Sequence, residues 1–304
     1  DNNVIINGNL ETNDFIDNSG GTINGSATAN NNLDNTGIIT GNAVATNGTL
    51  HNGLSGAGIS IGVIGGNATA GTNIINDINS SIGGNAIANG NIENYGLIQG
   101  NATATTGSLT NGGFLLFEGF FSGTISGDAT AGTSIINGYT ISSGNPNNII
   151  RAPNITGSTI LGNATAGTNI TNNLNSTIGS STANQITTGS LFNDGTINGS
   201  VLLTSTLTNT ANATINGNVV STHINTDSVT GDFLNNQLNN EGVINGNTAS
   251  NIFNQGNIIG NAIADATAFT GNGVTTGIKT ASITNSGNIT GSAIAITDIT
   301  NNAG

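Results

Sequence analysis

The chain has 304 residues and a formal net charge of −13, yet only 6% of its residues are charged, against roughly 25% in an average soluble domain. Because Lys and Arg total only 2, the basic clusters that bind nucleic acid or anionic lipid surfaces are missing. Cysteine is absent, which excludes disulfides and thiolate metal sites. No apolar run approaches the roughly 20 residues of a membrane span, so we expect no membrane insertion.

A nine-residue pattern, Leu/Ile-x-Asn-x-Gly-x-Ile-x-Gly, recurs along the chain. Its copies begin at Leu33, Ile92, Leu191, Leu238, Ile252 and Ile283. Several copies continue into Asn-Ala-x-Ala, as in Asn42–Ala45 and Asn101–Ala104. A repeat this short cannot bury its own apolar face and must stack on copies of itself. The chain is therefore predicted to be a solenoid and not a compact enzyme domain.

The Ile of each Ile-x-Gly marks the phase of the repeat, and neighbouring markers are mostly about 17 residues apart. In Asn67–Ala70 the alanines alternate with polar residues, which is the period of a strand, while Gly, Asn and Thr disfavour helices. We predict an all-β fold, a single parallel β-solenoid (β-helix) over residues 1–304, with about 16 coils of roughly 17 residues and with loop insertions. The long gaps from Ile125 to Ile160 and from Ile258 to Ile289 are each interpreted as two coils, and shorter gaps as one coil with an insertion.

Two segments, near 110–124 and 142–154, break the pattern and are predicted insertions. The first contains Phe114–Phe121, which is either a core plug under a loop or an exposed contact patch. A narrow coil lined by Ala has little room for large rings, so we favour the contact patch. The second contains both prolines and Arg151, and is predicted to protrude because proline removes a donor from a strand ladder.

The Asn of the nine-residue pattern recurs at one phase of the coil. Stacked amides at one phase can hydrogen-bond along the solenoid as a ladder. Alternatively, Asn is present only because it tolerates left-handed turn conformations. We favour the ladder, whose candidate members are Asn35, Asn94, Asn193, Asn240, Asn254 and Asn285.

No constellation of residues indicates catalysis, and we predict that the protein is not an enzyme and has no catalytic residues. The acidic residues are scattered, and the tightest pair, Asp14 with Asp17, has no basic neighbour. His51 and His223 stand far apart without a second His at ligand spacing, so no transition-metal site is predicted. Isolated Asp residues at turns leave weak surface Ca²⁺ binding as the one cofactor alternative.

Outward Thr residues suggest one minor alternative. Asn67 with Thr69, Asn101 with Thr103 and Asn163 with Thr165 would project from one flat polar face, and regular Thr arrays on solenoids can order water and bind ice. The same position is Val44 or Ile87 in other coils, which breaks the array. The frequent Asn-x-Ser/Thr sequons are expected by chance in a chain this rich in Asn and Thr.

Stretches such as Ile283–Gly291, which reads Ile-Thr-Asn-Ser-Gly-Asn-Ile-Thr-Gly, resemble the β-helical passengers of autotransporters and of two-partner-secreted, filamentous haemagglutinin-type surface proteins. The likeness is one of shape and spans most of the chain through its repeats. It implies a secreted, extracellular protein at the cell surface. Because the sequence begins at Asp1 and not Met, we expect a mature or excised segment.

We expect an extracellular structural protein, the subunit of a self-assembling surface filament, sheath or matrix fibre built by end-to-end stacking. Its partners would be copies of itself, because an open solenoid end exposes strand edges that template another copy and such contacts do not close. The alternative is the stalk of a bacterial surface adhesin that carries a glycan or cell-surface contact. Candidate interface residues are Val4, Ile5, Ile6, Phe114, Leu115, Leu116, Phe117, Phe120, Phe121, Ile294, Ile296 and Ile299.

Overall fold

The computed structural model describes residues 4–54, 60–115, 119–139, 157–211, 213–221, 237–240, 243–245, 248–249, 251–254, 257–259, 262–264, 283–290, 293–295 and 298–302. The side chains at 114–120, 220–264 and 294 are not described. The chain divides into two compact units, residues 1–167 with 175–177 and residues 168–174 with 178–304. We call them unit 1 and unit 2 and describe each by itself.

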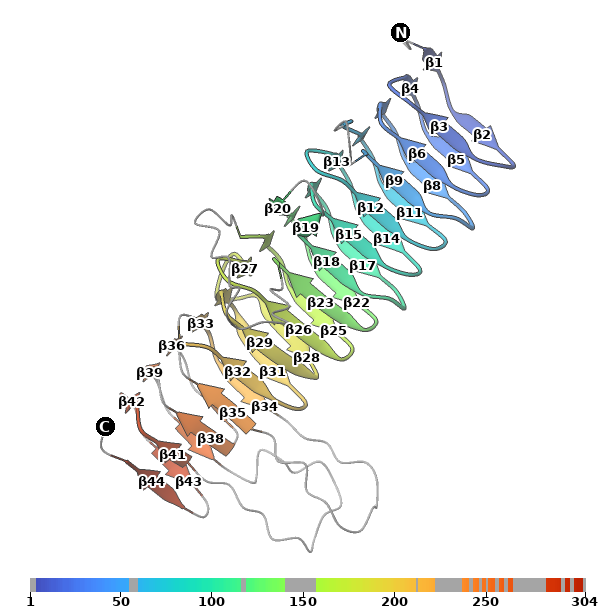
Figure 1. Ribbon diagram of the computed structural model, residues 1–304. Helices are drawn as coiled ribbons and strands as arrows, with labels where there is room; N and C mark the ends of the chain where they lie inside the picture. Colours follow the sequence, from blue (N-terminus) through green and yellow to red (C-terminus); the bar gives the residue numbers. More distant parts are fainter. Residues whose placement is uncertain are drawn as a thin grey trace, which may run out of the picture. The chain divides into compact units, whose positions relative to one another are not determined.

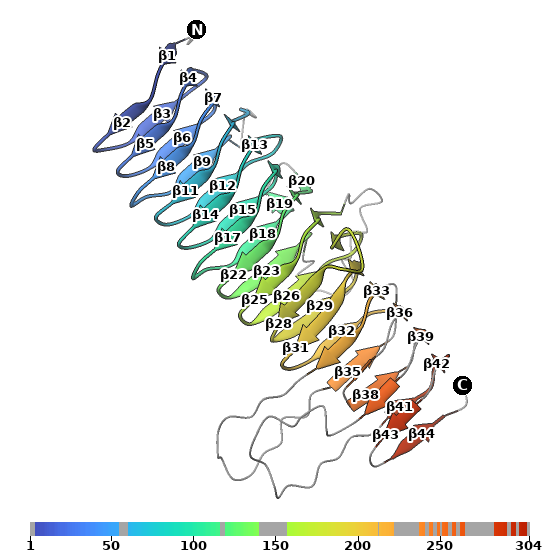
Figure 2. The ribbon, with the colours of Figure 1, turned by 180° about the vertical axis from the view of Figure 1, so that it is seen from behind.

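In unit 1 the chain visits three parallel sheets, A, B and C, in this order in every turn (Figures 1 and 2). Sheet A contains β1 (Ile5–Asn7), β4 (Thr22–Asn24), β7 (Ile38–Ile39), β10 (Val63–Ile64), β13 (Ser81–Ile82), β16 (Leu97–Ile98), β21 (Thr124–Ile125) and β24 (Thr159–Ile160). Sheet B contains β2 (Leu10–Thr12), β5 (Ala27–Ala29), β8 (Ala43–Ala45), β11 (Ala68–Ala70), β14 (Ala86–Ala88), β17 (Ala102–Ala104), β22 (Ala129–Ala131) and β25 (Ala164–Ala166). Sheet C contains β3 (Ile16–Asn18), β6 (Leu33–Asn35), β9 (Leu50–Asn52), β12 (Ile74–Asn76), β15 (Ile92–Asn94), β18 (Leu109–Asn111) and β23 (Ser134–Asn137).

Unit 2 repeats the same three-sheet plan, and β27 (Thr177–Ile178) of sheet A lies at the boundary between the units. Its sheet A contains β30 (Thr196–Asn198), β33 (Thr214–Asn216), β36 (Val243–Asn245), β39 (Asn257–Ile259) and β42 (Asn288–Ile289). Sheet B contains β28 (Gln185–Thr188), β31 (Ser200–Leu203), β34 (Val219–Ser221), β37 (Thr248–Ala249), β40 (Ala262–Ala264) and β43 (Ala293–Ala295). Sheet C contains β26 (Asn169–Asn172), β29 (Ser190–Asn193), β32 (Leu207–Asn209), β35 (Gln237–Asn240), β38 (Asn251–Asn254), β41 (Ile283–Asn285) and β44 (Ile299–Asn301).

The predicted all-β parallel solenoid is confirmed, with fewer turns than the roughly 16 expected. Within the described residues each parallel sheet contains fourteen strands. The difference arises at the two longest gaps, because Ile125 pairs directly with Ile160 and Ile258 directly with Ile289. Each of these gaps is therefore one coil with an insertion, and interpreting it as two coils was wrong.

The core of unit 1 is a stack of inward-facing rows along the three sheets. The marker isoleucines form the inner row of sheet A, so that Ile23 pairs with Ile39 and Ile39 with Ile64. Each strand of sheet B between β5 and β25 turns two alanines inward, and these alanines are at most 5% exposed. Because alanine fills little volume, sheet B can lie close to the other two sheets. Leu33, Leu50 and their equivalents complete the core from sheet C.

Glycine allows neighbouring turns to approach at the corners. At Gly37 a Cβ would lie 2.2 Å from the carbonyl oxygen of Gly21 in the preceding turn. Any other residue would push the two turns apart at this point, so the recurring Gly follows from coil spacing.

All long insertions of unit 1 leave from the corner between sheets C and A. The described part of the first predicted insertion is an antiparallel hairpin, β19 (Gly113–Leu115) with β20 (Gly119–Phe121). A further insertion follows β9 and is closed by a bridge between Leu54 and Ser60, which confirms that the gap from Ile39 to Ile64 is one coil with an insertion. The second predicted insertion, 142–154, lies outside the described residues, as do Leu116 and Phe117. The choice between core plug and contact patch for the Phe residues stays a prediction.

Candidate functional site

A ladder of buried asparagines runs along the inner side of sheet C, as the sequence predicted. In unit 1 the Nδ2 of each amide donates to the Oδ1 of the next, over 2.7–2.9 Å. The members are Asn18, Asn35, Asn52, Asn76, Asn94, Asn111 and Asn137. In unit 2 the same bond, at 2.8 Å, joins Asn172 to Asn193, Asn193 to Asn209 and Asn285 to Asn301.

The candidates Asn35, Asn94, Asn193 and Asn285 are therefore ladder members. Asn240 and Asn254 occupy the ladder position of their strands, but their side chains are not described. The alternative explanation by left-handed backbone is wrong for the ladder. Among the described non-glycine residues, positive φ occurs only at Asn79 and Asn175, which are not ladder members.

The same amides also close the corner between sheets C and A. Asn94 Nδ2 donates to the carbonyl of Gly96, two residues away, at 3.2 Å. Asn52 Nδ2 makes the corresponding bond across its insertion to Gly62, and Asn111 to Gly123, both at 3.1 Å. One ladder amide therefore closes the base of the connection whatever its length, which explains why the long insertions of unit 1 occur at this corner.

A second ladder, missed from sequence, lies at the corner between sheets A and B. Here the side-chain oxygen of each residue accepts a bond from the backbone N–H one turn later, over 2.7–3.1 Å. Its acceptors are Asn9, Ser26, Asn42, Asn67, Asn85, Asn101 and Asp128, and its last donor is Asn163 N. From Ser26 onward these residues stand directly before the alanine strands, so the recurring Asn-Ala-x-Ala combines a corner acceptor with two core residues.

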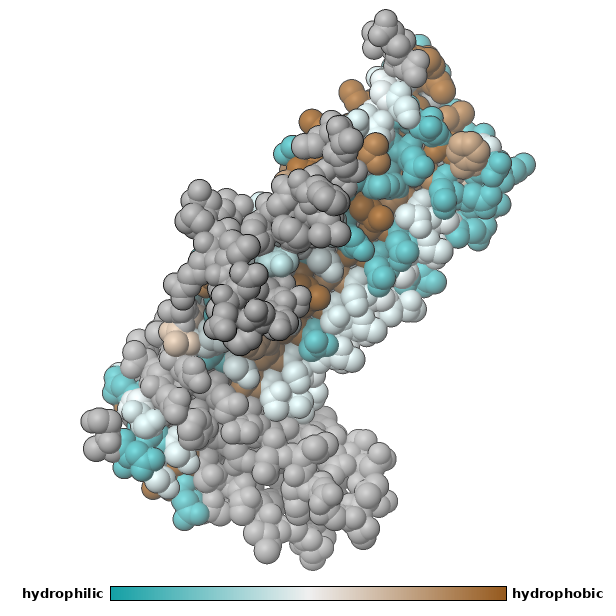
Figure 3. Space-filling view, in the orientation of Figure 1, coloured by the Kyte–Doolittle hydropathy of each residue, from teal (hydrophilic) through white to brown (hydrophobic). Residues whose placement is uncertain are grey.

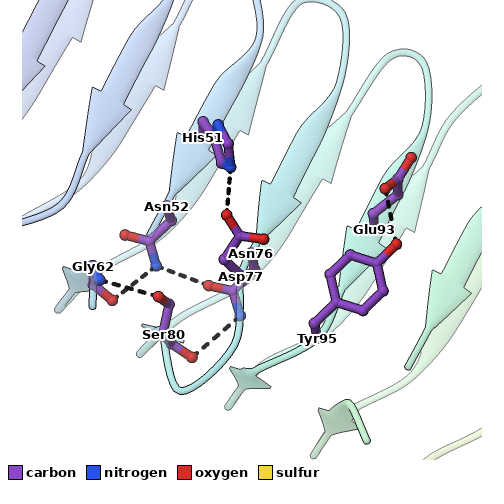
Figure 4. A network of polar contacts seen from close by, with 8 residues as sticks. All are labelled: His51, Asn52, Gly62, Asn76, Asp77, Ser80, Glu93 and Tyr95. Carbon is purple, nitrogen blue, oxygen red and sulfur yellow. Dashed lines mark hydrogen bonds and ion pairs between the residues drawn. The ribbon is translucent and has the colours of Figure 1, made fainter. Parts of the chain in front are cut away.

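Among the described residues of unit 1, the titratable groups with shifted pKa values, His51 and Tyr95, lie in a local cluster on sheet C (Figure 4). His51 Nε2 lies 2.5 Å from Asp77 Oδ2, and the Asp77 side chain is only 3% exposed. Its hydrogen bond to Asp77 raises the pKa of His51 above 6.5; the charges of Asp77, Asp34 and Glu93 act in the same direction, while burial opposes them. Burial, reinforced by the nearby Glu93, raises the pKa of Tyr95, whose hydroxyl donates to Glu93 at 3.0 Å.

This cluster holds the Asp77–Ser80 connection in place. Asp77 N donates to Asn52 O at 2.8 Å, and Ser80 Oγ accepts a bond from Gly62 N at 3.0 Å. The serine hydroxyl is thus engaged with backbone and makes no hydrogen bond to His51, so the arrangement does not resemble a nucleophile with its base. The sequence prediction did not pair His51 with Asp77, and His223 lies outside the described residues.

The remaining acidic candidates have separate partners. Asp14 accepts a bond from Asn31 Nδ2 at 2.9 Å, and Asp17 from the Ser19 hydroxyl. In the described part of the chain, no group of three or more His, Cys, Asp or Glu side chains could hold a metal ion. Among the same residues, no helix is long and apolar enough to cross a membrane.

The first described turn of unit 1 exposes apolar side chains and core residues. Val4 and Ile5 are 61% and 60% exposed, and Figure 3 shows apolar surface near this end. A cavity of about 310 Å³ opens there, lined by Val4, Ile6, Leu10, Asp17, Asn18, Ser19, Gly21 and Ile23. Three of these residues, Ile6, Leu10 and Ile23, lie in core rows, so the cavity is the end of the core.

The last described turn of unit 2 is similarly open. In β44 all three residues are exposed, and Ile299 is 51% exposed. Of the other interface candidates, Ile6 and Phe121 are half-buried, the side chains of Phe114, Leu115, Phe120 and Ile294 are not described, and Ile296 lies outside the described residues. Their role in assembly stays a prediction.

Three parallel sheets of short strands, joined by turns and held by an asparagine ladder, define the protein as a β-solenoid repeat protein. We found no match to the chain among protein-family models, curated proteins or solved structures.

Proposed function

We propose that the protein is an extracellular structural protein whose copies stack end to end into a surface filament, sheath or matrix fibre. The observation that carries the proposal is the open edge formed by β1, β2 and β3, where core residues border a cavity and Val4 and Ile5 are exposed. Unpaired strand edges are templates for further strands. The low content of charged residues, 6%, leaves little repulsion to oppose stacking.

The backbone of the first turn has donors directed at this open edge. Val4 O accepts from Thr22 N, and Gly8 N donates to Asn24 O, so both point toward the next turn. The backbone N–H and C=O groups of successive residues in a parallel strand point alternately to the two neighbouring strands. The N–H of Ile5 therefore points away from the next turn, toward the open edge. By the same alternation, Ile16 N and Asn18 O bond the next turn and Asp17 N–H points away from it.

A proline at this edge tests the proposal. Asp17→Pro removes a donor that no neighbouring turn uses, whereas Asp17→Ala changes the same side chain and keeps the N–H. We expect negative-stain electron microscopy at high protein concentration to show fibres for the parent and for Asp17→Ala, and few or none for Asp17→Pro. Circular dichroism checks that all three proteins are folded. Single particles of the parent at every concentration would refute end-to-end assembly.

The second candidate function, the stalk of a surface adhesin, is favoured by the insertions at one corner of unit 1. Repeat proteins often carry their insertions on the face that binds a partner. Asn94 and Gly96 are joined by a single residue, Tyr95, and Asn94 bonds the Gly96 carbonyl. Asn111 makes the same bond to Gly123 across the hairpin insertion. Residues 112–122 can therefore be replaced by a single tyrosine. If the hairpin binds a glycan or cell surface, this variant should stay folded and lose binding on glycan arrays and cells. A variant that binds as the parent does would exclude the hairpin as the contact.

A further inference from the structure

We infer that a joint between two copies continues the solenoid by one turn in register, with β44 of one copy on β3 of the next. The inference rests on the proposed end-to-end assembly and adds to it the polarity and the residue pairing of the joint. The interaction surface is then one turn at each end, and the partner is a second copy of this chain.

The polarity follows from the direction of the asparagine ladder. Each ladder bond between described residues runs from the Nδ2 of one amide to the Oδ1 of the next amide along the chain. Within the described residues, no donor reaches Asn18 Oδ1, and Asn301 Nδ2 has no acceptor. One end thus offers an acceptor and the other a donor at the same position of the coil, so that copies can only join head to tail.

The backbone groups are complementary in the same sense. Asp298 O and Asn302 N both bond the preceding strand, β41, so the peptide groups of Ile299 and Asn301 point away from it. Asp17 presents its N–H and C=O at the other end, as derived above. Placing Thr300 opposite Asp17 brings donors against acceptors in the pattern that already joins β3 to β6.

This register also matches the side chains. Within unit 2, Ile299 pairs with Ile283 and Asn301 with Asn285. At the joint, Ile299 would pair in the same way with Ile16 of the next copy, and Asn301 with Asn18. An apolar core row and the ladder both continue, and the acidic Asp17 faces an uncharged threonine. A shift by one residue would put the side chains of the whole turn on the wrong face.

Cysteine pairs test the register directly, because the chain contains no cysteine. Thr300 and Asp17 both point outward, and neighbouring strands lie about 4.8 Å apart, within the roughly 4.4–6.8 Å between Cα atoms of a disulfide. The double variant Asp17→Cys with Thr300→Cys should therefore form covalent chains of many copies under mild oxidation. The control, Asp17→Cys with Thr284→Cys, moves one cysteine a strand further from the joint, to about 10 Å, where no disulfide can form.

Non-reducing gel electrophoresis and electron microscopy of the same samples separate the outcomes. Regular covalent multimers for the first pair and not for the control support the inferred register. Fibres in which the first pair does not cross-link, or in which both pairs do so equally, overturn the register and leave end-to-end assembly standing. The absence of both fibres and cross-links overturns the proposed function together with this inference.

Discussion

Replacing Asn76 by alanine tests whether the ladder stabilises unit 1. Asn76 is fully buried, and its Oδ1 accepts a bond from Asn52 Nδ2 at 2.8 Å. Its Nδ2 donates to Asn94 Oδ1 at 2.8 Å, to Leu97 O at 3.2 Å and to Ser80 O at 3.4 Å. The Asn76→Ala variant removes all four bonds and leaves amide groups on both sides of the gap short of a partner.

The expected cost follows from those unmet groups. A buried donor or acceptor left unsatisfied costs about 1–3 kcal/mol. Asn52 Nδ2 retains its bonds to Gly62 O and Ser81 O, which places its loss at the lower end of that range. Adding the loss at Asn94 Oδ1, we expect the free energy of unfolding to fall by about 2–4 kcal/mol. Asn76→Asp should cost more at neutral pH, because it buries a charge and sets two acceptors against each other.

Urea unfolding followed by circular dichroism measures the loss, with Asn47→Ala as the matched control. Asn47 also bonds an asparagine of the preceding turn, Asn30, at 2.8 Å, but this pair is exposed and its loss should stay within about 0.5 kcal/mol. Because solenoid turns are stabilised by their neighbours, amide hydrogen exchange should rise mainly in the turns beside residue 76. Equal and small losses for the two variants would refute the role given to the buried ladder.

Three further predictions concern unit 1. The raised pKa of His51 means that its pairing with Asp77 contributes fully below pH 6.5 and is lost as the pH rises through the folded-state pKa; urea unfolding against pH should show this decline, and His51→Gln should abolish it. Gly53→Ala should lower the melting temperature, because φ is +96° and the added Cβ would lie 2.2 Å from a serine hydroxyl; Gly8→Ala, with φ +133° and open space, measures the backbone strain alone. Ala86→Val overfills the inner row of sheet B and should cost about 1–3 kcal/mol in urea unfolding.

The periodic part of the fold could be predicted from the sequence. Residues at one phase of a solenoid share one environment, so the marker isoleucines of unit 1 all reach the inner row of sheet A and the pattern asparagines reach the ladder. Members such as Asn52 and Asn137 were missed because the residues around them depart from the nine-residue pattern, although their coil position is the same.

The coil count and the local cluster could not be predicted in the same way. A gap of two coil lengths and one coil with a long insertion differ only in which strands pair, and sequence spacing does not carry that information. His51 and Asp77 are separated in sequence by an insertion, and the sequence does not show which residues of the two coils it brings together. The acceptor role of the asparagines before the alanine strands was missed because their recurrence was attributed to an outward polar face.

The same asparagine ladder that keeps the turns of the core in register also allows connections of different length at the corner between sheets C and A. Rows of similar residues, such as the paired alanines of sheet B, specify register weakly, because shifted copies still pack. A buried amide row specifies it strongly, since each member needs a partner at one position in the next turn. The same Nδ2 group also closes the connection beside it, so an insertion such as the one after Asn52 enters without disturbing the phase of the turns. A solenoid stabilised in this way keeps its register across coils of unequal length with almost no charged residues. The asparagine ladder also has a fixed direction of donors and acceptors, which is what a second copy would need to join it in register.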